Sequence, residues 1–430
     1  MKILLVSNLV LDRTSNMGKT FLAYFKDFMP GEVAQFYIYS EVPTDDSVCR
    51  NYYRFTDWDA LRSVFDRKAG GTVFGAEDID RSRTDPRTDT GMQTAVYRAG
   101  SKKTPLLHMM RNYIWEHSNW KSGKLMDWIA DFGPDAVFFA SGDSLFMYEI
   151  AGSIAESFRI PLIVSAVDDF YVFNRNEHQP FGKMYFRVFM NKVHETMDHA
   201  ACLLPICDSM DREYRNMFQI PSHVLRTPVD ERDLHLKKDA ERISYIGNLD
   251  FNRYRQLIDI GKTLKRIASP DIPGFLDVYS QERNPEILNE MTEENGIRFH
   301  GAISSEEVCR VMADSRAVVH TESFDPVTAE IVKYSVSTKI PESLMNGPCL
   351  IAYGPEGIES IDYLKRNGAA FVITSPDELE QGLRTVLSDE AVRNEILTRA
   401  RELAHENHDS AVIGKTVRGW IEECVECRKS

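Results

Sequence analysis

The stretch STKIPESLMNGP, residues 337–348, gathers residue types that could hold a phosphate group. Ser337 or Thr338 can cap the start of a helix, where free backbone N–H groups favour an anion. Lys339 adds a positive point charge. Glu342, one turn further on, can accept hydrogen bonds from ribose hydroxyls, as an acidic residue does in other nucleotide-binding sheets. An ordinary capped helix would explain the cap and the terminating Gly-Pro pair but not the whole set, so we interpret the stretch as a nucleotide-binding helix start.

A second candidate lies in YIGNLDFNR, residues 245–253. Its apolar start predicts a strand that ends near Gly247 and Asn248, followed by a loop that carries Arg253 toward a helix. Rossmann-like units meet anionic ligands at this point, and an arginine offers a charged planar fork to a diphosphate. A solvated arginine explains this motif, taken alone, equally well.

The segment NMGKT, residues 16–20, ends like a phosphate-binding P-loop. The motif needs a glycine five residues before Gly18, but Arg13 stands there, so we do not predict a nucleoside triphosphatase. A glycine between the first strand and the first helix lies at the ligand crevice of a doubly wound sheet. The alternative, a plain helix-start glycine, is left open.

Two further patterns suggest metal sites only weakly. HETMDH, residues 194–199, resembles a zinc-protease helix, but its second histidine is one residue too far along to share a helix face with the first. Cys424 and Cys427 have CxxC spacing without a second pair of ligands. We therefore predict no metal site.

Short apolar runs alternate with helical patterns along most of the chain, which predicts parallel, doubly wound sheets covered on both faces. The series breaks once, in RTPVDERD, so we expect an α/β protein with two Rossmann-like domains, residues 1–228 and 229–405. A C-terminal helix, residues 406–430, is expected to pack back on the first domain. The predicted strands are KILLVS, AQFYIY, DAVFFA, PLIVSAV and ACLLPI, then RISYIG, FLDVYS, IRFHG, RAVVH, CLIAY and AAFVIT.

Two segments outside this alternation have patterns of their own. The chain from Asp389 to the C-terminus predicts two helices with a break near residues 408–410. Residues 66–104 are polar and predict a long loop.

The composition narrows the class of protein. A chain of 430 residues, 43% hydrophobic and 27% charged, is typical of a globular protein of two or three domains. A net charge of −14 argues against a nucleic-acid partner. The apolar N-terminus is too short for a signal peptide, and we expect no membrane-spanning segment. Seven scattered cysteines indicate free thiols and a cytoplasmic location.

Taken together, the motifs resemble those of retaining GT-B glycosyltransferases of the family 4 type. YIGNLDFNR is similar to the first strand and loop of that family's C-terminal domain. FHGAISSEEVCRVMADSRAVVHTES resembles its following "hG.v..eel" passage, and STKIPESLMNGPCLIAYGPEG its donor motif "SKxxEYLAxGKPxLA". Upstream, CDSMDREYRNMF and VLRTPVDE also resemble family segments, so the resemblance covers most of the chain, with specific motifs in the C-terminal half.

The resemblance implies roles for individual residues. Arg253 stands five residues after Asn248, where the family has a lysine five residues after an arginine, so one of two positive charges is kept. Lys339 would hold the diphosphate, and Glu342 would bind the ribose. Gly18, Gly247, Asn248, Gly301, Ser337 and Thr338 complete the expected nucleotide-binding set.

Two departures from the family pattern concern the sugar. The family's other motif glutamate would fall at Tyr334 and is missing. Glu322 and Glu330 share the spacing of the glutamate pair, a match that we take as coincidental, leaving open that either touches the sugar. In SAVDDFY, which is similar to the family's "tvHDf", Asp168 occupies the histidine position that faces the donor sugar. We expect Asp168 to be catalytic or, as the alternative, to cap the segment after its strand.

The resemblance implies an enzyme that moves a sugar from a nucleoside-diphosphate sugar to a glycan or lipid-linked acceptor, with retention and without a metal or other cofactor. The N-terminal domain would bind the acceptor, and Lys339→Ala or Arg253→Ala would lower turnover with the fold intact. A basic and aromatic segment, residues 102–128, could rest on the inner face of a membrane, or be a core helix with a solvated basic face. The alternatives are a catalytically silent GT-B subunit that binds a partner enzyme and a GT-B sugar-nucleotide epimerase.

Overall fold

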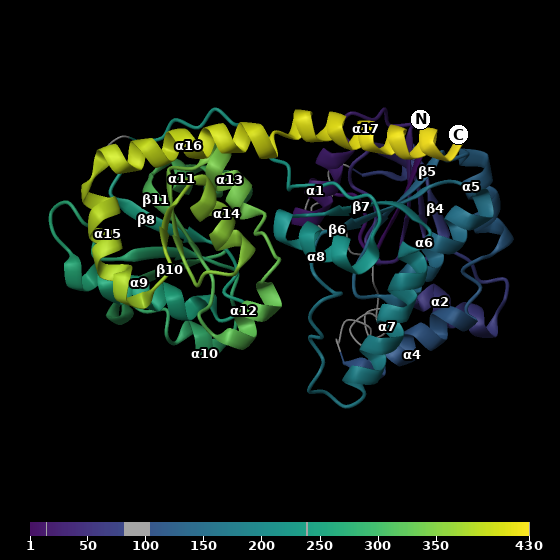
Figure 1. The fold of residues 1–430 in the computed structure, drawn as a ribbon, viewed down its shortest axis with the longest axis horizontal. Helices are drawn as coiled ribbons and strands as arrows, with labels where there is room; N and C mark the ends of the chain where they lie inside the picture. Colours follow the sequence, from purple (N-terminus) through teal and green to yellow (C-terminus); the bar gives the residue numbers. More distant parts are fainter. Residues whose placement is uncertain (14, 81–103, 238–239, 430) are drawn as a thin grey trace. The chain divides into compact units, whose positions relative to one another are not determined.

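The computed structural model describes residues 1–13, 15–80, 104–237 and 240–429, and it divides into two compact units (Figure 1). Unit 1 comprises Met1–Arg226 and Ser410–Ser430, whereas unit 2 comprises Thr227–Asp409. The last helix of the chain therefore belongs to the unit that begins it.

Unit 1 is built on a seven-stranded sheet in the order β4-β3-β2-β1-β5-β6-β7. Its neighbouring strands are parallel, except that β4 runs antiparallel to β3. Every residue of β1, β2, β5 and β6 is buried, as expected for strands covered by helices on both faces. The strands are β1 (Ile3–Ser7), β2 (Val33–Tyr37), β3 (Cys49–Arg54), β4 (Thr72–Phe74), β5 (Ala136–Ala140), β6 (Leu162–Ala166) and β7 (Ala200–Pro205). The helices are α1 (Asn16–Tyr24), α2 (Asp57–Phe65), η1 (Ala76–Asp78), α4 (Pro105–His117), α5 (Gly123–Phe132), α6 (Leu145–Phe158), α7 (Gly182–Met197), α8 (Asp208–Phe218) and α17 (Ser410–Lys429).

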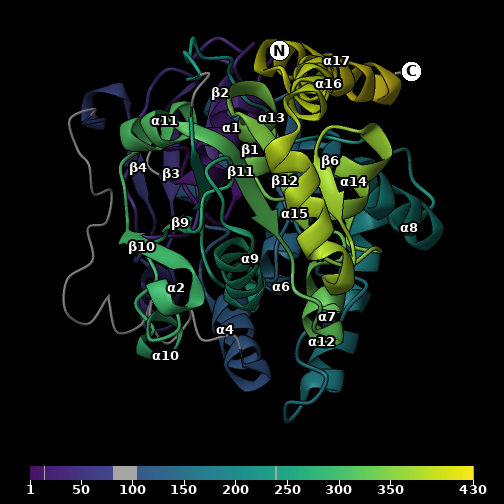
Figure 2. The same cartoon turned by 90° about the vertical axis from the view of Figure 1, so that its left-hand side faces the viewer.

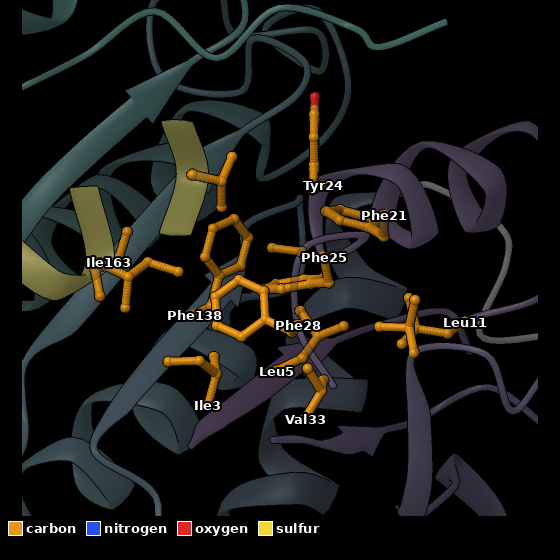
Figure 3. Close-up of a cluster of buried hydrophobic side chains, with 14 of the residues drawn as sticks. Ile3, Leu5, Leu11, Phe21, Tyr24, Phe25, Phe28, Val33, Phe138 and Ile163 are labelled. Atoms are coloured by element: carbon orange, nitrogen blue, oxygen red, sulfur yellow. The ribbon is translucent and has the colours of Figure 1, made fainter. Parts of the chain in front are cut away.

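Aromatic rings fill the core of unit 1 (Figure 3). Phe138 of β5 meets Phe25 edge-on at 5.1 Å, and Phe25 meets Phe28 at 5.6 Å. Helix α17 completes this core with side chains spaced four residues apart, which places them on one helix face. These side chains are Ile413, Val417, Ile421 and Val425.

Unit 2 is built on a six-stranded, fully parallel sheet in the order β10-β9-β8-β11-β12-β13. Apolar residues of α9 and α15 pack in one core cluster and those of α13 and α14 in a second, and α16 contributes to both (Figure 2). The strands are β8 (Arg242–Ile246), β9 (Leu276–Tyr279), β10 (Ile297–Gly301), β11 (Ser315–Thr321), β12 (Cys349–Tyr353) and β13 (Phe371–Ile373). The helices are α9 (Arg253–Ile267), α10 (Pro285–Leu288), η2 (Glu293–Asn295), α11 (Ser305–Ala313), α12 (Pro326–Val332), α13 (Lys339–Asn346), α14 (Glu359–Asn367), η3 (Pro376–Glu378), α15 (Leu379–Ser388) and α16 (Glu390–His408).

Two doubly wound sheets confirm the predicted fold class, but the strand prediction for unit 1 was incomplete. Strand β3 was missed because polar residues, including Arg50 and Asn51, interrupt its apolar positions. The predicted loop at residues 66–104 was wrong in its first part, where β4 and η1 form. Residues 81–103 of that loop lie outside the described part of the chain.

The predicted break between the two C-terminal helices is confirmed, since α16 ends at His408 and α17 begins at Ser410. Buried His408 is fixed on both sides of its ring: Nδ1 lies 2.8 Å from the Thr227 carbonyl oxygen and Nε2 lies 2.9 Å from the Tyr363 hydroxyl. Among the helices that the structure describes, none combines the length and the apolarity that crossing a membrane requires.

Candidate functional site

The loop between β8 and α9 has an uncommon backbone. Phe251 and Asn252 both have a φ of 58°, in the left-handed region that residues other than glycine rarely adopt. The Asn252 side chain holds the loop by donating to the Thr328 hydroxyl at 3.1 Å. This conformation starts α9 at Arg253, directly beyond the carboxyl end of β8, where doubly wound sheets bind ligands.

Arg253 is held by a buried glutamate. Its Nε and Nη2 donate to the Glu322 carboxylate at 3.0 to 3.1 Å, and its Nη1 donates to Asn248 Oδ1 at 3.0 Å. The Glu322 side chain is 2% exposed and that of Arg253 is 13% exposed. The predicted pair Asn248 and Arg253 is therefore brought together, with Glu322 on the far edge of the guanidinium.

Glu322 follows β11 directly and draws on two further residues. The Ser360 hydroxyl donates to Glu322 Oε1 at 3.2 Å, and His320 Nε2 lies 3.3 Å from the same oxygen. Burial alone would raise the pKa of Glu322, but the contact with His320 and the charge of Arg253 outweigh it and lower that pKa below 4.5. The carboxylate is therefore stabilised in its charged form.

Lys339 opens helix α13 and carries a charge without an ionic partner. Within the described ranges, the ammonium of Lys339 has neither a hydrogen bond nor a carboxylate at ion-pair distance. Burial, and then the charge of Arg253, lower the pKa of Lys339 below 10.5. A bound anion would relieve this cost, because it would compensate the ammonium and favour its protonated form.

Only one of the two predicted capping residues contributes at the start of α13. Thr338 occupies the N-cap position, but its side chain makes no capping hydrogen bond. The Ser337 hydroxyl accepts from the Lys339 backbone N–H at a long 3.4 Å. The first turn thus keeps backbone N–H groups that an anion could use.

Glu342 pairs with Arg232 rather than with Arg253. Its carboxylate pairs with Arg232 at 3.0 Å, and Arg232 also contacts the Cys309 thiol. The expected ribose-binding role of Glu342 would require the nucleotide to share this carboxylate with Arg232.

Two predicted glycines are needed for local structure. A Cβ on Gly247 would lie 2.9 Å from the Tyr245 hydroxyl, so a side chain there would press on its own strand. Gly301 ends β10 with a φ of 75° and has open space around it. Gly247 directly follows β8 and Gly301 ends β10, so both glycines lie at carboxyl ends of strands in the unit 2 sheet, with β9 between those strands.

The two candidate residues in unit 1, Asp168 and Gly18, contact residues that are close to them in the sequence. Asp168 follows β6, pairs with Arg175 at 3.1 Å and accepts a hydrogen bond from the Asp169 backbone N–H at 3.0 Å. Gly18 lies in the first turn of α1, where a Cβ would come within 2.5 Å of the Asp12 carbonyl oxygen. The chain's own backbone therefore accounts for Gly18.

Sequence reasoning took the spacing of Glu322 as coincidental and left open that it touches the sugar, whereas the structure places Glu322 beside Arg253, together with His320 and Ser360. The available signal was an acidic residue directly after a predicted strand, in a sheet whose strand ends bind ligands. Among the described residues, no group of three His, Cys, Asp or Glu side chains is arranged to hold a metal ion.

Comparisons with known proteins address the fold and the family. Residues 266–417 match a family model described as "Glycosyl transferase-like". Crystal structures of similar fold include Anabaena HepE in complex with UDP (12% identity, 98% of this chain and 100% of that chain, TM-score 0.63). They also include the sucrose-phosphate synthase of Thermosynechococcus elongatus (10% identity, 99% and 100% of the chains, TM-score 0.63).

A third structure of similar fold is WaaG, a glycosyltransferase involved in lipopolysaccharide biosynthesis (11% identity, 96% and 98% of the chains, TM-score 0.52). No curated protein matches the chain in sequence. The two parallel sheets show the GT-B fold that the sequence resemblance implies, and residues 266–417 are similar to the glycosyl transferase-like family.

Proposed function

We propose that this enzyme takes its sugar from a nucleoside-diphosphate sugar bound at the carboxyl edge of the unit 2 sheet. The observation that carries the proposal is the pairing of two cations there, Arg253 and Lys339, each of which lowers the cost of a nearby negative charge. Lys339 has no ionic partner among the described residues. It opens a helix whose N-cap side chain, Thr338, makes no capping hydrogen bond. A diphosphate supplies the missing negative charge. Neighbours of similar fold have been crystallised with UDP and with UDP-glucose, which makes UDP a suitable first probe.

The proposed reaction proceeds with retention and without a metal. The bond between the anomeric carbon and the diphosphate oxygen breaks, and the acceptor oxygen forms its bond to the same face of that carbon. The acceptor proton passes to the departing phosphate oxygen. Arg253, Lys339 and the α13 N-terminus stabilise the charge that develops on the leaving diphosphate, and they do so most strongly in the transition state.

The test is a panel of nucleotide sugars incubated with the pure protein, with release of nucleoside diphosphate as the readout. Slow hydrolysis of one donor, lost in Lys339→Met, supports the transferase. Conversion of one nucleotide sugar into another would favour the epimerase instead. If no donor releases nucleoside diphosphate with any candidate acceptor, and calorimetry detects no UDP binding, the proposed donor site is refuted and the catalytically silent subunit is favoured.

For the acceptor we propose a glycan or lipid-linked molecule at a membrane surface, met by helices α4 and α7 of unit 1. His108 of α4 stacks on Tyr185 of α7 at 5.1 Å, so the two helices lie side by side (Figure 1). Large apolar side chains spaced three or four residues apart are exposed on both helices or at their ends. They are Leu106, Met110 and Tyr113, and Phe181, Met184 and Val188.

This stripe differs from the basic and aromatic surface expected from residues 102–128. Trp115 and Trp120 are buried, and Arg111 is turned inward onto Asp57 at 2.8 Å. Lys102 and Lys103 lie outside the described residues. The apolar stripe, rather than the predicted basic face, therefore supports the membrane contact.

Vesicle co-sedimentation tests this contact. We expect Met110→Glu to reduce binding to vesicles that contain anionic lipid, because a charge in the stripe would have to enter the interface. Met29→Glu, at an exposed methionine outside the stripe, is the matched control. Equal sedimentation of wild type and Met110→Glu would refute the contact. A cytoplasmic location at the inner face of a membrane suits the seven free cysteines.

A further inference from the structure

Glu322 is a buried carboxylate that already accepts four hydrogen bonds, and it contacts the donor-site arginine. We infer that Glu322 is a positioning residue: it fixes the guanidinium of Arg253 so that one edge faces the donor diphosphate, without itself contacting the donor. This inference rests on the proposed function, because it presumes a diphosphate beside Arg253.

The first argument is how the guanidinium divides its donors. Nε and Nη2 are committed to Glu322, whereas Nη1 reaches the neutral Oδ1 of Asn248, a residue exposed to solvent. A phosphate oxygen forms a stronger, charge-assisted hydrogen bond than an amide oxygen does. The Nη1 edge is thus the one that a diphosphate can take over, while the Glu322 edge stays fixed.

The second argument is that Glu322 has no capacity left for a sugar. A carboxylate offers about four lone-pair sites. Its oxygens already accept four hydrogen bonds, three from Arg253 and one from the Ser360 hydroxyl, and His320 Nε2 lies 3.3 Å from Oε1. A sugar hydroxyl could bind only by displacing one of these partners from a buried site. Glu322 therefore acts through Arg253.

The third argument separates orientation from attraction. The negative charge of Glu322 weakens the pull of Arg253 on a diphosphate, since opposite charges in contact offset each other. If attraction alone mattered, removing that charge would help the enzyme. A positioning role predicts the opposite for turnover, because a guanidinium free to tilt stabilises the leaving group less well at the moment of bond breaking.

The test is a double-mutant cycle with Glu322→Gln, Arg253→Met and the double variant, each assayed for donor turnover and for UDP affinity. We expect Glu322→Gln to lower kcat by about ten- to a hundredfold, in line with the cost of a 1 Å misplacement. UDP affinity should change by less than about threefold, because the loss of orientation is offset by the removal of a charge that opposes the diphosphate. In the Arg253→Met background, Glu322→Gln should lower kcat no further.

Glu359→Gln is the matched control, because Glu359 is also a buried glutamate of unit 2 paired with an arginine, Arg366, and has no place in the proposed donor site. It should keep wild-type kcat. If Glu322→Gln does not fold, Ser360→Ala serves instead, since it removes one hydrogen bond from Glu322 Oε1. Its loss of kcat should likewise vanish in the Arg253→Met background.

The outcomes are distinguishable. The positioning role is supported if the wild type turns over the donor and Glu322→Gln lowers kcat when Arg253 is present but not in Arg253→Met. Losses that multiply in the double variant, or a Glu322→Gln enzyme that loses UDP affinity as strongly as turnover, would mean that Glu322 contacts the donor, and the inference would be overturned. A wild type that binds no UDP and turns over no nucleotide sugar removes the proposed function and the positioning role with it.

Discussion

Replacing Arg253 should destabilise unit 2 as well as slow the enzyme. The sequence led to the expectation that Arg253→Ala would leave the fold intact. The structure changes that expectation, because Arg253→Met or Arg253→Ala leaves the Glu322 carboxylate, whose side chain is 2% exposed, without its cation. A buried charge that loses its partner is costly, whereas exchanging both partners for neutral residues of similar size is often harmless.

The size of the effect follows from burial. Breaking a buried ion pair from one side costs about 3–5 kcal/mol. Ser360 and His320 stay beside Glu322 in the variant and compensate part of its charge, so we expect the lower end, about 3 kcal/mol. With a urea dependence of about 2 kcal/mol per molar, the unfolding midpoint should fall by about 1.5 M. In Arg253→Met/Glu322→Gln most of that loss should disappear, while turnover stays low.

The distribution of tryptophan allows a clean assay in the full chain. All five tryptophans lie in unit 1 and none lies in residues 227–409. Fluorescence therefore follows unit 1, and circular dichroism near 222 nm follows the helices of both units. Arg253→Met should shift the dichroism transition to lower urea and leave the fluorescence transition in place. An unchanged dichroism midpoint, or no recovery in the double variant, would refute the reasoning about the buried pair.

Three further predictions concern charge and packing. UDP affinity, measured by calorimetry, should fall as pH rises through the pKa of Lys339. Because burial and the charge of Arg253 lower that pKa below 10.5, the fall should begin below the range of an ordinary lysine. Lys339→Arg should lack this fall, and a wild type with constant affinity to pH 10 would contradict the prediction. The hydrogen bond from Arg418 lowers the pKa of Glu32 from 4.5 to about 2, so the stability that the pair gives unit 1, about 1 kcal/mol after solvent screening, should be present above pH 4.5 and lost as pH falls toward 2. Arg418→Met should therefore lower the urea midpoint seen by fluorescence at pH 7 and have little effect near pH 2, and equal shifts at both pH values would argue against the pair. Gly261→Ala should lower the melting temperature of the protein, because its Cβ would lie 2.5 Å from a backbone carbonyl oxygen, whereas Gly419→Ala, which meets open space, should not; equal melting temperatures would show that α9 can shift.

Most of the strands predicted from the sequence, such as β1, β5 and β12, are runs of mainly apolar residues. Such strands are buried on both faces of a parallel sheet, and no other local structure suits five consecutive buried residues as well. Strand β3 escaped because Arg50 and Asn51 lie at its partly exposed positions. Its identity as a strand depends on pairing with β2, which a local pattern does not contain.

The site could be predicted in part for the same reason. Lys339 and Arg253 each stand at the start of a helix, which sequence patterns indicate. Which carboxylate would face them depends on the folded geometry: Glu322 is brought to Arg253 because β11 and β8 are neighbours in the sheet, although 69 residues separate the pair along the chain. Glu342, which stands only three residues after Lys339, pairs with Arg232 instead.

The place of α17 in the core of unit 1 has a consequence for synthesis on the ribosome. Residues 1–226 leave the ribosome first, but the helix that covers part of their apolar core is made last, after all of unit 2. At about 5–20 residues per second, the interval is on the order of ten seconds or more. Throughout it the nascent chain carries an uncovered apolar surface that a chaperone could bind, and a chain that stops at residue 409 would keep that surface permanently.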